Sequence, residues 1–457
     1  MNDRKPQPSH PRMPWGLGAL ALLALATSGA AQAQQTRSFV SCVDDRWETP
    51  NCWSPSGVPG SLDTALIGGN RTAVLVSTTA VSRTEVTDAI LQIFGGTLTT
   101  GTLAVNGGGL VGVTGSVNIS QLALNSAGGE IVVLSPGIFD LGPAGGLANR
   151  GVLTLRGGTV NGGNANLANF GQVGVAFQST IASAQFSQSG SLTVAGQSTL
   201  TVSSALFVNS GTITLNSSPT SPVALQGNTL RHDGWLLTGG GRVNNPIIVG
   251  GGAISPGAGQ DLILQGAVQF DRPAPIQVDG PAGGRLFFQG DTRFGGSNFH
   301  QITGGGRTEF GQELQLGPDV PVPVRLSAIG TVALQSGSNL FMRLAADGTA
   351  DSMVVSDGLF LQGGTLTFTS LDGNALGIGN SFTLFPQTTL SGNFGNISFV
   401  ELPLAAGANL DFSQLYTNGT LSVVAVPEPG TWLMLMAGLA GLGAVTRARR
   451  RPVAVPA

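Results

Sequence analysis

The sequence predicts an all-β fold, a right-handed parallel β-helix whose coils stack into a rod, and three observations support this prediction. From about residue 72 onward, short runs alternate Val, Leu or Ile with Thr, Ser or Asn, and such period-2 alternation is typical of strands. The chain contains 70 glycines but only 10% charged residues, which indicates many tight turns. One short pattern also recurs at nearly constant intervals, as it does in repeat architectures.

The first element, residues 1–33, is predicted to be a secretory signal peptide that signal peptidase removes. A basic stretch precedes an apolar core of about ten residues, and the small residues Ala31 and Ala33 follow at the expected cleavage site. A short uncleaved anchor is the alternative, but ten apolar residues are too few to span a bilayer of about 30 Å. We therefore expect the chain to be exported.

Residues 34–71 are expected to cap the rod at its N-terminal end. Cys42 and Cys52 have nine residues between them, and after export into an oxidising compartment this spacing predicts a small disulfide loop. A metal site is the alternative, but further ligands are missing. Trp47 and Trp53 accompany the loop and predict an apolar plug, which a stack of strands needs because its end exposes an unpaired edge.

Residues 72–343 are predicted to form the β-solenoid, because four copies of one pattern occur within them. The pattern is a large apolar residue, any residue, Asn or Gln, any residue, Gly, any residue, and then two apolar residues separated by one. The copies begin 20, 19 and 21 residues apart, at Leu147, Leu167, Phe186 and Phe207. We expect each copy to be one coil that buries its face against its neighbours. Ordinary antiparallel hairpins are the alternative explanation of this spacing.

Equivalent positions in the four copies make three structural predictions. One set should stack inward at the strand spacing of about 4.8 Å: Leu153, Val173, Leu192 and Ile213. A second set should form a ladder of side-chain amides at a bend: Asn149, Asn169, Gln188 and Asn209. The third set should supply turn conformations: Gly151, Gly171, Gly190 and Gly211. About fifteen such coils would rise roughly 70 Å.

Residues 344–425 are expected to form a strand-rich C-terminal cap. The stretches Asp347–Phe368 and Asn380–Pro403 resemble the terminal part of autotransporter-type passengers, in which such a cap closes the last coils of a β-helix. Nothing after Ala425 resembles the outer-membrane barrel of that family, which needs at least eight strands. Delivery to the cell surface is therefore expected to use a different route.

Residues 426–451 resemble the sorting segment of PEP-CTERM proteins of Gram-negative bacteria. Its parts occur in the family's order: the signature tripeptide Pro427-Glu428-Pro429, an apolar stretch from Thr431 to Val445 that includes Trp432, and a basic end with Arg447, Arg449, Arg450 and Arg451. The resemblance implies that an exosortase, a membrane transpeptidase, recognises and cuts this segment.

Physical arguments independently support a transient membrane role for this segment. The apolar residues Trp432 to Val445 would form a short transmembrane helix of about 21 Å, less than the hydrocarbon thickness of about 30 Å, and thus a weak permanent anchor. The arginines would stay on the cytoplasmic side, while Pro427 and Pro429 would keep the tripeptide extended and outside the helix. A packed helix of a soluble domain is the alternative, but the apolar residues cover every face.

The composition argues against several functions. Lys5 is the only lysine, so the exported chain would lack a Schiff-base or phosphate-loop lysine. Three histidines are too few for a clustered zinc or iron site, and we expect no metal and no other cofactor. Removing both ends would change the net charge from −3 to −9, because the N-terminal segment carries +2 and the four C-terminal arginines carry +4. An acidic body disfavours nucleic acid as a partner.

The predicted function is that of an exported, non-enzymatic structural or adhesive protein. It would be anchored transiently in the inner membrane and then reach the cell envelope, cell surface or extracellular polysaccharide matrix. Expected partners are an exosortase-like enzyme, signal peptidase, extracellular polysaccharide and further copies of the chain. The alternative is a surface-attached polysaccharide lyase or hydrolase, in which Asp271 and Asp291, near Arg272 and Arg293 and one repeat length apart, would pair on adjacent coils.

Overall fold

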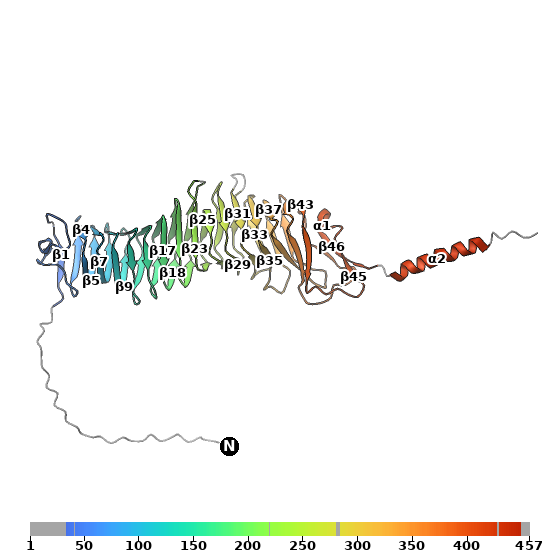
Figure 1. The fold of residues 1–457 in the computed structure, drawn as a ribbon, viewed down its shortest axis with the longest axis horizontal. Helices are drawn as coiled ribbons and strands as arrows, with labels where there is room; N and C mark the ends of the chain where they lie inside the picture. Colours follow the sequence, from blue (N-terminus) through green and yellow to red (C-terminus); the bar gives the residue numbers. More distant parts are fainter. Residues whose placement is uncertain (1–32, 41, 219, 280–283, 427–428, 449–457) are drawn as a thin grey trace, which may run out of the picture.

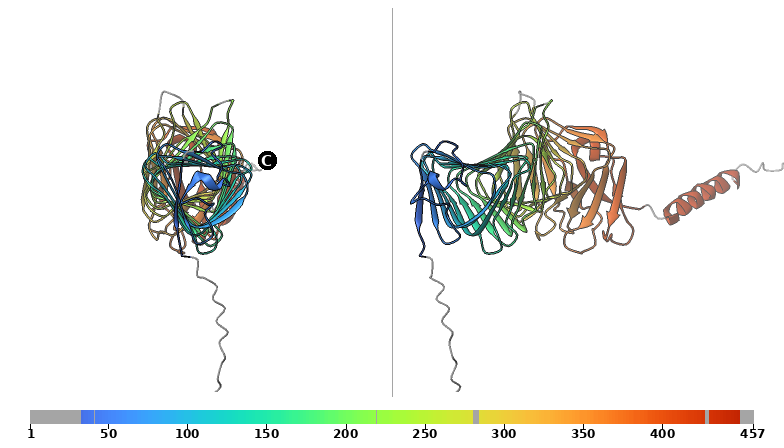
Figure 2. Two further views of the ribbon diagram at one scale, coloured as in Figure 1. Left: turned by 90° about the vertical axis from the view of Figure 1, so that its left-hand side faces the viewer. Right: turned by 60° about the vertical axis from the view of Figure 1, so that its left-hand side comes forward.

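The computed structural model describes residues 33–40, 42–218, 220–279, 284–426 and 429–448. In these ranges the strands form an elongated body, along which the colours of Figure 1 run in sequence order from blue to orange. Figure 2 shows the same body end-on and obliquely, as a ribbon wound into stacked coils. The fold is a parallel β-solenoid of about 13 turns. The predicted all-β solenoid is therefore confirmed.

Each coil in the middle of the body contributes one strand to each of three parallel ladders, so the coil has three faces. Strands that are neighbours within a ladder belong to consecutive coils and pair in parallel. Antiparallel hairpins, the alternative explanation of the repeat, are excluded for these coils because their chain directions would alternate.

The strands divide among the ladders by face. Ladder 1 contains β4 (Thr72–Leu75), β6 (Ile90–Ile93), β8 (Leu110–Val113), β10 (Glu130–Leu134), β13 (Val152–Arg156), β16 (Gln172–Ala176), β19 (Ser191–Ala195), β22 (Thr212–Asn216), β25 (Leu236–Val243), β27 (Ala253–Pro256), β30 (Ile276–Gln277), β33 (Phe299–Thr303), β36 (Arg325–Ala328) and β39 (Ser352–Val355). Ladder 2 contains β5 (Thr78–Thr87), β7 (Thr97–Asn106), β9 (Ser116–Asn125), β11 (Ile138–Asp140), β14 (Thr159–Asn161), β17 (Gln178–Ala182), β20 (Ser198–Val202), β23 (Val223–Gly227), β28 (Asp261–Leu264), β31 (Arg285–Phe288), β34 (Arg307–Phe310), β37 (Thr331–Leu334), β40 (Leu359–Gln362) and β43 (Leu390–Asn393). Ladder 3 contains β12 (Gly146–Asn149), β15 (Asn166–Asn169), β18 (Gln185–Gln188), β21 (Leu206–Asn209), β24 (Leu230–His232), β26 (Ile247–Val249), β29 (Val268–Phe270), β32 (Thr292–Phe294), β35 (Glu313–Leu316), β38 (Asn339–Leu344), β41 (Thr365–Ser370) and β44 (Asn396–Val400). The long strands β5, β7 and β9 also continue ladder 3, and β25 also joins ladder 2.

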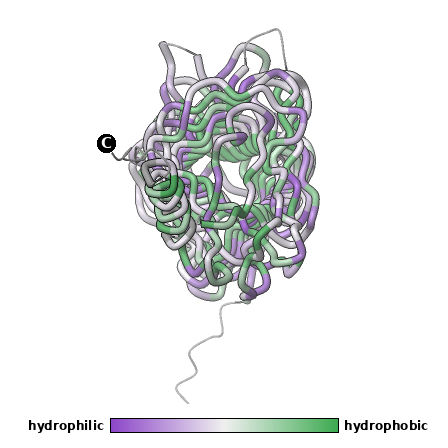
Figure 3. The backbone as a smooth tube through the Cα atoms, turned by 90° about the vertical axis from the view of Figure 1, so that its right-hand side faces the viewer, coloured by the Kyte–Doolittle hydropathy of each residue, from purple (hydrophilic) through white to green (hydrophobic). Residues whose placement is uncertain are grey.

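The hydrophobic core fills the inside of the coils, because inward positions of successive strands align. Buried and more exposed positions alternate along the strands, as in β13 and β16, and hydrophobic and hydrophilic segments are mixed around the coils when the body is viewed along its stack (Figure 3). The four inward residues predicted from the repeat align directly with one another and are at most 1% exposed. Such stacking buries nearly all of their apolar surface, which is the main favourable contribution to folding.

A buried ladder of amides runs along the bend after ladder 3, as the repeat predicts. The Nδ2 of Asn149 donates to Oδ1 of Asn169 over 2.6 Å, and the Nδ2 of Asn169 donates to Oε1 of Gln188 over 2.7 Å. Asn125 adds a further rung, donating to Asn149 over 2.7 Å. The amides of Asn149 and Asn169 also donate to backbone carbonyls of later coils. The side-chain N–H groups of Asn125, Asn149 and Asn169 are thus paired, as burial requires, although the Oδ1 of Asn125 has no partner among the described residues. The ladder is interrupted after Gln188, whose Nε2 donates to the carbonyl of Thr212 over 3.4 Å instead of to Asn209.

The four repeat glycines serve close packing between coils and not, as predicted, an unusual turn conformation. None of Gly151, Gly171, Gly190 and Gly211 has a positive φ. A Cβ on Gly190 would instead overlap the carbonyl oxygen of Gly171 in the preceding coil and the backbone of Phe170. Backbone stacked directly on backbone leaves no room for any side chain, so only glycine fits.

The later coils are longer than the repeat predicts. Leu192 aligns with Ile213 in the next coil, whereas Ala328 aligns with Val355, which is a longer interval in the sequence. The extra residues lie in loops between strands. Coils of about 20 residues would have produced about fifteen turns over the same length, and the longer ones reduce the number to about 13.

The N-terminal end is closed by a short segment held by a disulfide. Strand β2 (Trp53–Ser54) pairs antiparallel with β1 (Thr36–Phe39) after the 3₁₀ turn Pro50–Cys52, and Cys42 is bonded to Cys52 with a Cα–Cα distance of 5.1 Å. The rings of Trp47 and Trp53 are buried and meet edge to face, with centroids 4.8 Å apart. They form the expected apolar plug. Parallel pairing already begins here, between β1 and β3 (Thr64–Gly68).

The C-terminal end combines continued coils with a small antiparallel sheet. Parallel ladders run on to β43 and β44, beyond residue 343, where the solenoid was predicted to end. Strands β43 and β44 pair with β40 and β41 and so add a further coil to the stack. The cap proper is the sheet β42 (Ser381–Thr383), β46 (Thr420–Ala425) and β45 (Ala408–Asp411), with the one-turn helix α1 (Leu415–Asn418) beside it.

Candidate functional site

The sorting segment follows the folded body almost at once. Strand β46 ends at Ala425, and the backbone N–H of Val426 still donates to the carbonyl of Gly407 over 2.8 Å. The helix α2 (Pro429–Ala448) begins at the last residue of the Pro-Glu-Pro tripeptide and lies beyond the orange end of the body in Figure 1. The prediction that Pro429 stays outside the helix is wrong, because the first helical position tolerates proline, whose missing N–H has no intrahelical partner there.

The described side chains of α2 are exposed around the whole helix. Its large apolar side chains are each more than half exposed: Leu433, Met434, Leu435, Met436, Leu439, Leu442 and Val445. A helix that is apolar on every face suits lipid better than the surface of a soluble body. Among the described helices, none has both the length and the apolar character needed to cross a bilayer.

The two termini contain further residues that are predicted to act in cleavage or sorting. Six of them lie outside the described residues: Ala31, Pro427, Glu428, Arg449, Arg450 and Arg451. Ala33 is exposed ahead of β1, and Trp432 and Arg447 belong to α2. The roles of these residues in cleavage and sorting stay predictions.

The structure does not bring Asp271 and Asp291 together. Asp271 follows β29 and Asp291 precedes β32, and these strands pair in register, so the carboxylates sit at opposite ends of the pair. Four residues along a strand separate the two levels by about 13 Å. The Asp271 carboxylate instead contacts Arg231 over 3.8 Å, and Asp291 accepts the backbone N–H of Glu313 over 3.3 Å. Stacking of the pair on adjacent coils, which the enzyme alternative requires, is therefore wrong.

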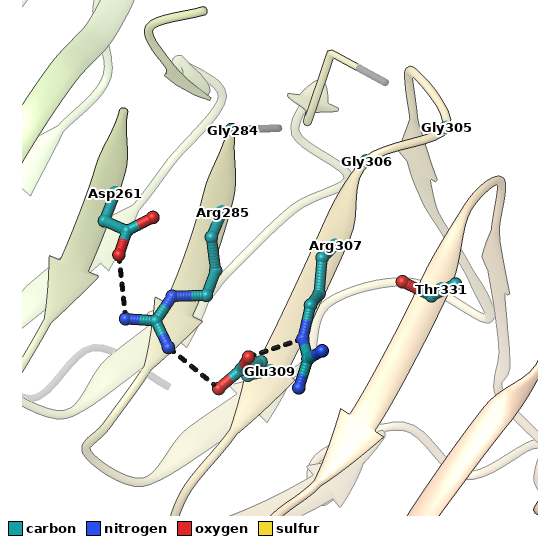
Figure 4. Close-up of a pocket in the computed structure, with 8 residues that line it drawn as sticks. All are labelled: Asp261, Gly284, Arg285, Gly305, Gly306, Arg307, Glu309 and Thr331. Atoms are coloured by element: carbon teal, nitrogen blue, oxygen red, sulfur yellow. Dashed lines mark hydrogen bonds and ion pairs between the residues drawn. The ribbon is translucent and has the colours of Figure 1, made fainter. Parts of the chain in front are cut away.

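A different charged cluster lies on the outer face of ladder 2, where consecutive strands carry it (Figure 4). The Nη2 of Arg285 contacts Asp261 over 2.9 Å, and its Nη1 contacts Glu309 over 3.3 Å. The Nε of Arg307 contacts the other carboxylate oxygen of Glu309 over 2.6 Å. Gln335 donates to Glu309 over 2.7 Å. We call Asp261, Arg285, Arg307 and Glu309 the charged stripe.

The charged stripe lines an open hollow on the surface. Glu309 is the buried centre of the stripe, since its side chain is only 3% exposed, whereas that of Arg307 is 51% exposed. The hollow has a volume of about 540 Å³ and includes the backbone of Gly284, Gly305 and Gly306 and the side chain of Thr331. A second hollow of about 390 Å³ adjoins it at Asp261 and includes Arg242. Because both hollows include Asp261 and are lined from successive strands of ladder 2, they follow one another along the solenoid, and we call the two together the groove.

Sequence reasoning missed this stripe, although a weak signal exists. Asp261, Arg285 and Arg307 occupy aligned positions in consecutive coils. The two intervals between them in the sequence are unequal, and both are longer than the interval of the clear repeat. Alignment by period alone therefore does not reveal that the side chains meet.

His232 occupies the position after Asn209 in the row of buried polar side chains. Its Nε2 lies 2.9 Å from the carbonyl of Ala253, which only accepts, so Nε2 carries the proton. Its Nδ1 then accepts from the side-chain amide of Asn209 over 2.9 Å. Burial lowers the pKa of His232 below its ordinary value of 6.5, and burial likewise lowers the pKa of His300, which packs 5.1 Å from the ring of Phe294.

These histidines should make the fold sensitive to mild acid. The unfolded chain binds protons at both residues below about pH 6.5 while the folded chain resists protonation, so stability should be full above that pH and fall below it. Replacing His232 by Asn, the residue of most other rungs, should reduce the loss of unfolding free energy between pH 7.5 and 5.5 by up to about 1.4 kcal/mol per pH unit. Denaturant unfolding at the two pH values measures this difference. An unchanged pH dependence in His232→Asn would contradict the assignment.

Comparison with known proteins identifies the C-terminal segment. A family profile described as the PEP-CTERM protein-sorting motif matches residues 425–451. Comparisons with curated proteins and with solved structures each produced no match. The motif implies that the chain is an exported surface protein with a transient membrane anchor, and that an exosortase-type enzyme processes it. The resemblance of residues 347–403 to autotransporter passengers stays a prediction.

Proposed function

We propose that this chain is a non-enzymatic structural or adhesive rod, delivered by its sorting motif to the surface or extracellular polysaccharide matrix of a Gram-negative bacterium. Signal peptidase would remove the N-terminal segment and an exosortase-type enzyme the C-terminal one. The observation that carries the proposal is the match of residues 425–451 to the sorting motif, placed directly after a long β-solenoid.

The geometry around the tail supports this proposal. An exposed apolar helix suits temporary residence in a membrane, and only residues 426–428 separate it from β46. Three residues can span at most about 10 Å, so the folded cap would stand close to the membrane until the tail is cut. A transpeptidase would reach Pro427 and Glu428 in this gap and release the rod from the anchor.

Several features of the body support a structural or adhesive role. The outer faces of the coils carry many uncharged Thr, Ser and Asn side chains, which pair readily with hydroxyl groups of sugars. The separation of Asp271 from Asp291 removes the best-supported catalytic pair of the enzyme alternative. A long solenoid whose sorting segment is removed after export would suit a structural component of an extracellular matrix.

The sorting step is tested by replacing Pro427, Glu428 and Pro429 with alanine in a host that has an exosortase-type enzyme. The unaltered chain should lose its tail and leave the membrane fraction, because the enzyme reads the tripeptide, whereas the triple variant should keep its tail and remain there. Mass spectrometry of the C-terminus, together with cell fractionation, provides the readout. Pro452→Ala with Pro456→Ala, beyond the arginines, is the matched control and should be processed normally. Normal processing of the triple variant would contradict the proposal.

A further inference from the structure

We propose that the groove along ladder 2 binds a linear polysaccharide that carries carboxylate groups, with Arg307 and Arg242 as its main contacts. The inference rests on the proposed function in one respect, because the chain must be exported to a place that contains polysaccharide. The groove itself belongs to the folded body and does not depend on processing of the tail.

Arg307 is the best-placed donor for such a ligand. Only its Nε contacts Glu309, and Figure 4 shows its two Nη groups free of contact with the other residues drawn. Two adjacent N–H groups in a planar fork match the two oxygens of a carboxylate. Glu309 holds the Nε side of Arg307, and is held in turn by Arg285 and Gln335. The guanidinium is therefore oriented before any ligand arrives, which lowers the entropic cost of binding.

Arg242 provides a second cationic position farther along the groove. It is exposed on β25, and among the described residues it takes part in no ion pair. Its strand lies three coils from that of Arg307, since β25, β28, β31 and β34 are successive members of ladder 2. At the strand spacing the two arginines are about 14 Å apart along the rod. An extended polymer with charges at intervals can contact both, whereas a small anion can contact one.

The surface between the two arginines offers contacts for sugar rings. Ile263, which lines the hollow of Arg242, and Phe287 next to it occupy aligned outward positions between Arg242 and Glu309, and both are partly exposed. The guanidinium of Arg285 lies 5.4 Å from the ring centre of Phe287, which keeps the ring in place. Sugar rings present C–H groups on their faces and hydroxyl groups at their edges, so an apolar floor with polar walls accommodates them.

The charge of the groove favours an acidic over a neutral polymer. Three arginines face two carboxylates, so the groove is locally positive on a body that would otherwise carry a net negative charge. Both carboxylates are paired with Arg285, which reduces their repulsion of an anionic ligand. The surrounding negative charge would repel an acidic polymer elsewhere and thereby confine it to the groove.

The test compares two hexasaccharides with the full chain in detergent. Hexagalacturonate carries a carboxylate on every sugar and maltohexaose carries none. Calorimetric titration should show that hexagalacturonate binds at least about tenfold more tightly at low salt, and that its binding weakens as sodium chloride is raised. Equal binding of the two hexasaccharides, or no binding of hexagalacturonate, would overturn the proposal.

Variants locate the binding within the groove. Arg307→Gln and Arg242→Gln should each weaken hexagalacturonate binding about tenfold, as expected for a lost charged hydrogen-bond pair. Arg293→Gln is the matched control, because that side chain is 49% exposed on ladder 3 and lies outside the groove. Arg242 is outside the ion-pair network, so its variant should keep the wild-type unfolding temperature. Wild-type affinity in both groove variants would overturn the proposal. If the tail is left unprocessed while the groove binds as described, the proposed function fails and this inference stands.

Discussion

Replacing Gly190 by alanine should cost more than about 3 kcal/mol of unfolding free energy, enough to open the middle of the solenoid at moderate temperature. A Cβ at this position would overlap the carbonyl oxygen of Gly171 and the backbone of Phe170. Neither group can move away easily, because the strands on both sides are held in register by ladder hydrogen bonds. The coils would have to separate locally, which would also expose inward residues.

Gly174 provides a matched control for this substitution. It lies on β16 in the preceding coil, and a Cβ there would meet no atom within 4 Å. Gly174→Ala should therefore change stability by no more than about 1 kcal/mol, and in the stabilising direction, because alanine restricts the unfolded chain. Thermal and denaturant unfolding followed by circular dichroism compare the two variants. Similar losses in both would show that close backbone packing is not the reason for the repeat glycine.

Replacing Asp351 by alanine should destabilise the last coils of the solenoid by about 3–5 kcal/mol. The Asp351 side chain is fully buried and accepts the backbone N–H groups of Val324 and Arg343 over 2.7 and 2.9 Å. It also accepts both Nε and Nη2 of the Arg343 guanidinium over 2.9 and 3.0 Å. The alanine variant leaves all four donors without this acceptor and one guanidinium without its counter-charge in a poorly solvated place.

Asp357 is the control for Asp351, since it lies shortly after it in the sequence and is exposed. Asp357→Ala should change stability by less than about 0.5 kcal/mol. Limited proteolysis reports the difference locally, because only Asp351→Ala should make residues 344–425 readily cleaved while the earlier coils stay protected. Equal protection of residues 344–425 in both variants would argue against a structural role for the ion pair of Asp351 and Arg343.

The repeat region shows which structural features a local sequence pattern can predict. The alternation around Leu153 and Ile213 and the Asn-x-Gly spacing predict inward stacking and an amide ladder. The stacking occurs throughout, and the ladder runs as far as Gln188. The pattern also indicates that a glycine is needed at each bend, yet the reason is found only in three dimensions. The constraint comes from the backbone of the preceding coil and not from the glycine's own φ. His232 likewise takes the position of Asn209 in the next coil, where Leu230 and Gly234 keep the pattern and only the Asn or Gln is replaced.

The charged residues show where prediction from sequence ends. Asp271 and Asp291 are one repeat length apart in the chain, yet they lie at opposite ends of paired strands. Arg285 and Glu309 are farther apart in the sequence and nevertheless touch. The difference arises because a coil in the later part of the body contains a variable number of loop residues. Which side chains meet depends on the register of each new strand on the last one, and loop length shifts that register.

The class of the fold and the export of the chain are both predicted from the sequence alone. Alternation with period 2 and a short repeat of constant length specify stacked strands through interactions within one coil or between neighbours, and the sorting motif is a short linear signal that requires no folding partner. The three-dimensional fold alone reveals the number of turns, the close backbone contact at Gly190, and the charged stripe around Glu309. These features depend on contacts between residues of different coils. The lengths of the loops decide which residues of neighbouring coils align, and the loop sequences show no repeat from which this alignment could be predicted.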